Sequence, residues 1–150
     1  MNVLDKSHYF RGVLLLMRKD FKVSPEEKKF VFKLGKTLGF DREFVDDSIK
    51  DILYNEFIDE KPPKFTDPKI AECFIKDGMR LIVSDHAIDP NEMKFLEKTA
   101  QANSLNKDWF ETVINTEKNN VYNDELDLEI KSFIEWFLVK CKWGENYLKI

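Results

Sequence analysis

The hydrophobic positions along the chain follow the spacing of amphipathic helices. Apolar residues recur three and four positions apart, runs of β-branched residues are short, and glycine and proline occur only five times each. This pattern predicts an all-α fold, a bundle of about seven helices in a single domain over residues 1–150. The expected organisation is a first three-helix unit over about 3–55, a connector over about 56–67, a second three-helix unit over about 68–117 and a C-terminal helix over about 124–142.

Capping signals mark where several of these helices begin and end. In Ser24-Pro-Glu-Glu27 the serine is the expected N-cap, and Glu27 is its capping-box partner. The stretch Asp89-Pro-Asn-Glu92 opens a later helix in the same way. Gly39 follows the last apolar position of the second helix, and glycine readily takes the left-handed conformation that ends helices. The sequence therefore predicts helix starts near 24 and 89 and a helix end at 39.

The apolar stripe of each helix indicates which residues we expect in the core. On the third helix this stripe includes Phe44 and Val45, and on the sixth helix it includes Trp109 and Phe110. The C-terminal helix is expected to bury Leu126, Ile130, Phe133, Ile134, Phe137, Leu138 and Cys141.

The chain contains an internal repeat. When the sequence is shifted by 65 positions, residues 20–49 fall on residues 85–114 without a gap, and seven of the 30 positions are identical. Average composition would give roughly two identities. The identical pairs are Asp20/Asp85, Pro25/Pro90, Glu27/Glu92, Lys29/Lys94, Phe30/Phe95, Lys33/Lys98 and Ile49/Ile114. We infer two related three-helix units packed about a pseudo-twofold axis; the alternative is that any two capped helices look alike.

The repeated corners between helices have acidic residues that suit a cation. Asp20 ends one helix and Glu27 lies in the first turn of the next, and Asp85 and Glu92 have the same places in the second unit. If the two corners meet, four carboxylates converge, and such oxygen ligands bind Ca²⁺, Mg²⁺ or Mn²⁺. His86 is a further candidate ligand. The alternative is that these acids only cap helices, because Glu27 and Glu92 already fit capping boxes.

Asp77 stands out because it falls on the inward face of the fourth helix. A buried carboxylate needs a partner. We expect either a salt bridge or hydrogen bond, with Arg80 or Arg11 as candidates, or a place for Asp77 in the acidic metal site. Gly78 beside it indicates close packing of another helix at this point.

Three apolar residues of the C-terminal helix lie off its main inward face. They either pack against the last residues of the chain or form an apolar patch for a protein partner or a second copy of the chain. These residues are Trp136, Val139 and Trp143.

Composition narrows the class of protein. The formal net charge is −4, with 24 basic and 28 acidic residues, so nucleic acid is not an expected partner. The longest apolar runs are far shorter than the roughly 20 residues that cross a bilayer, so no transmembrane segment is expected. Cys73 and Cys141 are expected to be reduced and buried, which favours a cytoplasmic location. Because no known catalytic motif occurs, we expect neither enzymatic activity nor a required cofactor.

The repeated corners resemble those of the tellurite-resistance TerB-like family over roughly residues 10–115. That family's pattern is an aspartate that ends a helix, an aliphatic residue, and a glutamate that opens the next helix. The matching residues are Asp20, Val23 and Glu27 in the first unit and Asp85, Ile88 and Glu92 in the second. The resemblance implies a helical bundle of two repeated units, a non-catalytic role in chemical or metal stress, and metal binding by the acidic corners.

Two functions follow as expectations. The first is a TerB-like binding module, related to tellurite or chemical stress, with a divalent-cation site in the acidic corners. The alternative is a protein-interaction scaffold or homo-oligomer that works through an apolar surface near the C-terminal helix and needs no metal.

Overall fold

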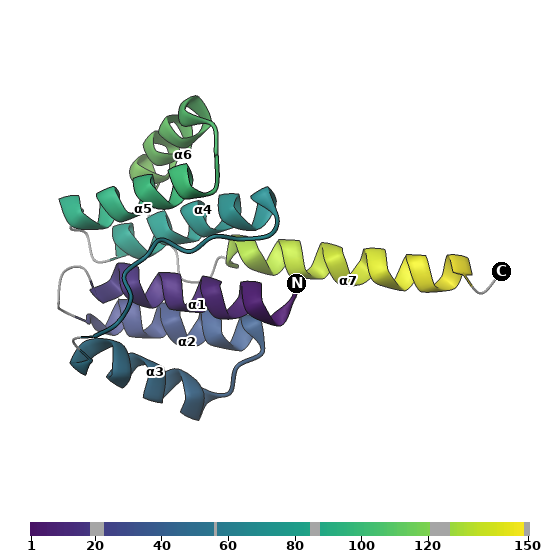
Figure 1. The fold of residues 1–150 in the computed structure, drawn as a ribbon, viewed down its shortest axis with the longest axis horizontal. Coiled ribbons are helices and arrows are strands. Elements are labelled where there is room, and N and C mark those ends of the chain that lie inside the picture. Colours follow the sequence, from purple (N-terminus) through teal and green to yellow (C-terminus); the bar gives the residue numbers. More distant parts are fainter. Residues whose placement is uncertain (19–22, 56, 85–87, 121–126, 149–150) are drawn as a thin grey trace.

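The fold is all-α, as predicted. A computed structural model describes residues 1–18, 23–55, 57–84, 88–120 and 127–148, with side chains up to residue 140, and all regular secondary structure in these residues is helical (Figure 1). The helices are α1 (Val3–Arg18), α2 (Pro25–Leu38), α3 (Arg42–Tyr54), α4 (Pro68–Ser84), α5 (Pro90–Ala102), α6 (Lys107–Asn119) and α7 (Glu129–Leu148).

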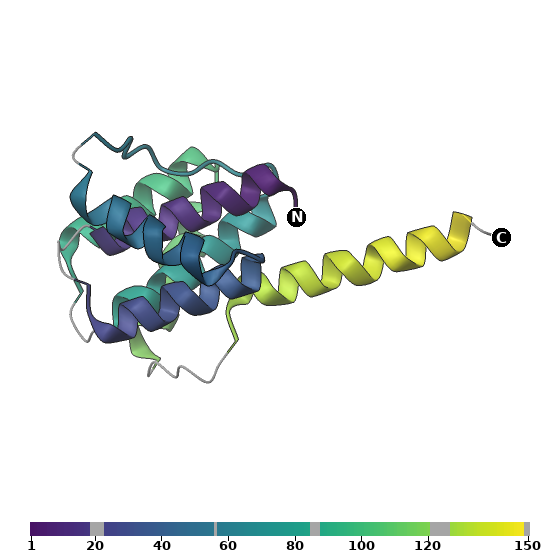
Figure 2. The ribbon, with the colours of Figure 1, turned by 90° about the horizontal axis from the view of Figure 1, so that it is seen from below.

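The first six helices form a bundle in which α1, α2 and α3 pack against one another, as do α4, α5 and α6. The two groups meet mainly through α4, which contacts both α1 and α2. Helix α7 begins against α4 and then extends away from the bundle, as Figures 1 and 2 both show. The relation between the two three-helix groups as repeats stays a prediction from the sequence.

Local capping explains where the helices start. Ser24 and Glu27 form a reciprocal capping box, with the Glu27 N–H donating to Ser24 Oγ at 3.1 Å and the Ser24 N–H donating to Glu27 Oε1 at 3.2 Å. Asp41 and Asn106 cap α3 and α6 in the simpler way, by accepting one backbone N–H each. Gly39 ends α2 with φ of 85°, the left-handed conformation that the sequence predicts.

The core is centred on α1 and α4, and small residues let neighbouring elements approach closely. A Cβ atom at Gly78 would lie 2.8 Å from a methyl group of Leu96 on α5 and 3.2 Å from one of Leu16 on α1. The close helix packing predicted at Gly78 is therefore confirmed. The largest fully buried side chains are Tyr9, Phe74, Leu15, Leu16, Met17, Leu34, Leu38, Ile70, Ile75, Met79, Leu81 and Ile82.

The connector between the two halves is an irregular strap that runs past α1 to the start of α4 (Figure 1). On the side of α1, Asp5 accepts hydrogen bonds from the Thr66 backbone N–H at 3.1 Å and from its hydroxyl at 2.5 Å. On the other side, Asn103 at the end of α5 accepts a bond from the Phe65 N–H at 2.9 Å and donates one to the Pro63 carbonyl at 2.8 Å. The strap is thus tied to both halves.

Two expectations for buried residues are wrong. Phe44 is 48% exposed, because it stacks at the surface on Phe40 and Phe10 and does not enter the core. Phe137 and Leu138 are also exposed, because none of the other described helices covers this part of α7, which projects from the bundle (Figure 2). Helix α7 also starts later and extends further than the predicted 124–142. Leu126 and the Cys141 side chain lie outside the described residues.

No helix among the residues that the structure describes is long and apolar enough to cross a membrane.

Candidate functional site

The carboxylate of Asp77 joins α4 to α1 and α7. It is fully buried, and the Tyr9 hydroxyl of α1 donates a hydrogen bond to its Oδ2 at 2.6 Å. The backbone N–H groups of Glu129 and Ile130 donate to Oδ1 and Oδ2 at 2.8 and 3.2 Å. These N–H groups begin α7 and have no acceptor within their own helix. Asp77 therefore caps α7 from another helix.

Arg80 is the ionic partner of this carboxylate. Its Nη1 lies 3.7 Å from Asp77 Oδ1 and donates to the Asp127 carbonyl at 2.9 Å, while its Nη2 pairs with Glu129 Oε1 at 2.6 Å. The predicted partnership with Arg80 is confirmed. Arg11, the other candidate, instead donates to the Asp59 carbonyl in the connector at 3.0 Å. Arg80 thus strengthens the attachment of α7 to the bundle.

Burial raises the pKa values of three titratable side chains in this region. Burial raises the pKa of Asp77 to about 6, against the lowering effect of hydrogen bonds from Tyr9 and Glu129 and of the Arg80 charge. Burial, followed by the nearby Asp77 charge, raises the pKa of Tyr9 well above its ordinary value. Burial also raises the pKa of Cys73, which is not in a disulfide, to about 12. A thiol in this state is a poor nucleophile, so Cys73 is not suited to covalent catalysis.

Beyond its attachment, α7 exposes four successive large apolar side chains. Trp136, Phe137, Leu138 and Val139 are 47%, 41%, 56% and 53% exposed. The Trp136 ring is flanked by the Lys69 ammonium at 5.0 Å and the Lys140 ammonium at 4.5 Å from its centroid. Trp136 and Val139 are therefore exposed where the sequence analysis placed them off the inward face. The Trp143 side chain lies outside the described residues.

Only the glutamates of the two acidic corners lie among the residues that the structure describes. Glu27 and Glu92 are 2% and 1% exposed, in the first turns of α2 and α5. Both helices start at the same end of the bundle, opposite to the end from which α7 projects (Figures 1 and 2). Asp20, Asp85 and His86 lie outside the described residues. Within the part of the chain that is described, no three potential metal ligands lie together, and Asp77 is engaged with Tyr9 and α7.

Sequence reasoning missed Tyr9, which holds one oxygen of the central carboxylate. The residue lies on the apolar face of α1, and a buried tyrosine hydroxyl usually has a hydrogen-bond partner. The position of Tyr9 on the apolar face could therefore have predicted a buried hydrogen bond from its hydroxyl. It could not have predicted that the acceptor lies 68 positions further along the chain.

Comparison of the chain with protein-family models, with curated proteins and with solved structures found no match. The resemblance to the TerB-like family therefore rests on the sequence pattern alone.

Proposed function

We propose that this protein is a non-catalytic protein-interaction module whose working element is the projecting part of α7. The observation that supports this proposal is the exposed run from Trp136 to Val139. Successive residues of an α-helix point about 100° apart, so four in a row cover all sides of the helix. Helices that are apolar all round are normally buried against other protein. This part of α7 projects beyond the other described helices, and we infer that a partner chain covers it (Figure 2).

The simplest partner is a second copy of the chain. Two projecting helices can bury each other's apolar side chains without any further component, and twofold pairs are the commonest protein assemblies. The attachment through Asp77 and Arg80 holds the start of α7 in place, so the helix is presented in a defined direction. The exposed Trp136 and Phe137 are also typical of protein interfaces, which are rich in aromatic residues.

Replacing Leu138 and Val139 together with lysine is expected to weaken self-association at least about tenfold, because each new charge would have to be buried in the interface. Sedimentation equilibrium from about 10 μM to about 1 mM chain measures the dissociation constant. The control is Phe57→Lys, which removes an apolar side chain that is 94% exposed elsewhere on the protein. A wild-type chain that stays monomeric over this range would show that a second copy is not the partner.

We propose a divalent-cation site at the acidic corners as a second candidate function. Its support is the near-complete burial of Glu27 and Glu92 at equivalent places in two helices that start at the same end of the bundle. Buried carboxylates are commonly paired with a cation or with hydrogen-bond donors. The TerB-like resemblance of the corners also favours a metal.

Native mass spectrometry of the metal-free chain, titrated separately with Ca²⁺, Mg²⁺ and Mn²⁺, tests the cation site. We expect one retained ion per chain, lost when Asp20 and Asp85 are both replaced by asparagine. Bound metal also raises the melting temperature in proportion to its affinity for the folded state. If none of the three ions is retained, Glu27 acts only as a helix-capping residue and Glu92 only as a buried structural residue.

A further inference from the structure

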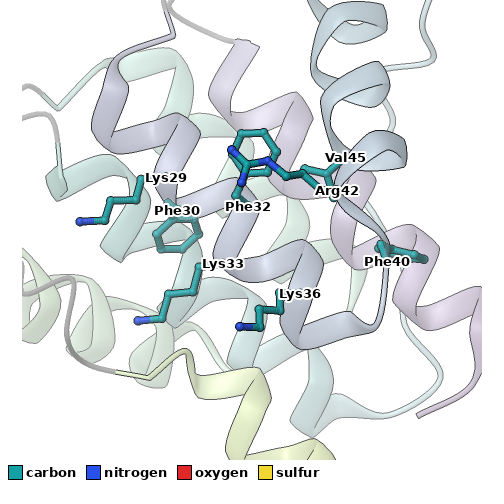
Figure 3. A pocket seen from close by; sticks show the side chains of 8 residues that line it. All are labelled: Lys29, Phe30, Phe32, Lys33, Lys36, Phe40, Arg42 and Val45. Atoms are coloured by element: carbon teal, nitrogen blue, oxygen red, sulfur yellow. The ribbon is translucent and has the colours of Figure 1, made fainter.

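A cationic groove lies between α2 and the start of α3. It has a volume of about 440 Å³, and the residues that line it include Phe32, Phe40 and four basic residues. We call it the α2–α3 groove. The basic residues are Lys29, Lys33, Lys36 and Arg42 (Figure 3).

The charge of this groove is opposite to that of the whole protein. Among the residues that the structure describes, four basic residues and no acidic residue line it, whereas the chain has a net charge of −4. Figure 3 shows the three lysines following one another along α2. A concave surface with cations on a low-dielectric wall attracts anions more strongly than isolated surface lysines do.

The apolar floor of the groove sets a second requirement for its ligand. The Arg42 guanidinium lies over the Phe32 ring, 5.0 Å from its centroid, so an aromatic face and a cation are presented together (Figure 3). Phe40 adds another partly buried ring at the other end of the groove. A volume of about 440 Å³ lies within the roughly 300–1,000 Å³ of ordinary ligand pockets. The matching ligand therefore combines negative charge with an apolar group.

The internal repeat provides a comparison within the same chain. Lys94, Phe95 and Lys98, which match Lys29, Phe30 and Lys33 in sequence, line a second cavity of about 440 Å³ beside Arg18. That cavity also contains Glu60, so its charge is partly balanced by a carboxylate from the connector. The Lys-Phe-x-x-Lys pattern thus borders a cavity in both halves. Among the described residues, the charged side chains that line the α2–α3 groove are all basic, whereas those of the second cavity include Glu60.

We infer that the α2–α3 groove binds an acidic segment of a partner protein, which places an apolar side chain against the apolar floor of the groove. Lys36 and Arg42 would pair with carboxylates of the segment. Charge complementarity supports a protein segment of this composition, since acidic amphipathic segments present both features together. A flat anionic membrane fits less well, because the apolar groups of the groove line a hollow and do not protrude into a bilayer. This surface is separate from the exposed run on α7.

Fluorescence anisotropy with a labelled synthetic peptide tests this inference. The probe is a helical peptide of about 15 residues with glutamate on one face and leucine and phenylalanine on the other. We expect binding that the Lys36→Glu and Arg42→Glu double substitution weakens at least about tenfold, and that rising salt also weakens. Lys36 and Arg42 are both exposed, so the substitutions leave the core intact.

Matched controls separate the groove from general charge attraction. The double substitution Lys107→Glu and Lys118→Glu makes the same change in net charge at exposed positions of α6 and is expected to leave the affinity within about twofold. Two control peptides, one with serine in place of leucine and phenylalanine and one with lysine in place of glutamate, are expected to bind at least about tenfold more weakly.

Three results would overturn the inference: no binding of the acidic amphipathic peptide, equal loss of binding in the α6 control, or equal binding of the serine-substituted peptide. Vesicles containing phosphatidylserine are the remaining comparison. Groove-dependent binding to these vesicles without binding to the peptide would assign the site to a membrane surface and also overturn it.

Discussion

Replacing Asp77 with alanine is expected to lower the free energy of unfolding by about 3–5 kcal/mol. The substitution removes the acceptor for the Tyr9 hydroxyl and for the first two N–H groups of α7, and it removes the charge that faces Arg80. Buried donors left without an acceptor lose their hydrogen bonds to water without replacement, and this loss is the main part of the expected cost.

Urea denaturation of the wild-type and Asp77→Ala proteins measures this change, and hydrogen exchange at the start of α7 localises it. In the Asp77→Ala protein, we expect amide exchange to accelerate relative to the wild type, and to do so more in the first turns of α7 than in α2. Tyr9→Phe, which removes only one of the donors, is expected to cost about 1 kcal/mol and gives a folded reference. Glu72→Ala on the same helix is the control. Equal costs for Glu72→Ala and Asp77→Ala would contradict the assigned role.

The stability that Asp77 contributes is expected to decrease as the pH rises. Its pKa is about 6 in the folded protein and 3.8 as an ordinary aspartate, so between these values the folded chain binds more protons than the unfolded chain. The free energy of unfolding of the wild type, relative to Asp77→Asn, should therefore fall by about 2 kcal/mol between about pH 4 and pH 7.

Parallel denaturation of wild type and Asp77→Asn at several pH values measures this difference, and the comparison cancels the titration of the other carboxylates. A difference that grows with pH would mean that the hydrogen bonds to the anion outweigh its burial, with a pKa below 3.8 in the folded state.

Features that depend on neighbouring residues could be predicted from the sequence. The capping box at Ser24 and the helix end at Gly39 each need only a few successive residues. The inward position of Asp77 follows from the helical period of α4, and its pairing with Arg80 follows from their spacing of three positions.

Features that depend on distant parts of the chain could not be predicted. One donor to Asp77, the Tyr9 hydroxyl, lies 68 positions before it in the sequence. The backbone donors at the start of α7 lie 52 and 53 positions after it. The apolar pattern of α7 predicted burial of Phe137 and Leu138, but periodicity does not show whether the chain supplies a surface to cover them. The lysines of α2 look like a solvated helix face until the fold places Arg42 and Phe40 beside them.

The strap between α3 and α4 has a consequence for how the protein unfolds. It bonds to Asp5 on α1 and to Asn103 at the end of α5, so one short segment depends on both halves for its hydrogen bonds. If either half opened alone, backbone groups of the strap would lose their acceptors and the buried Phe65 would lose its cover. The free energy of opening one half is therefore linked to that of the other, which favours a single cooperative unfolding transition over independent unfolding of two subdomains.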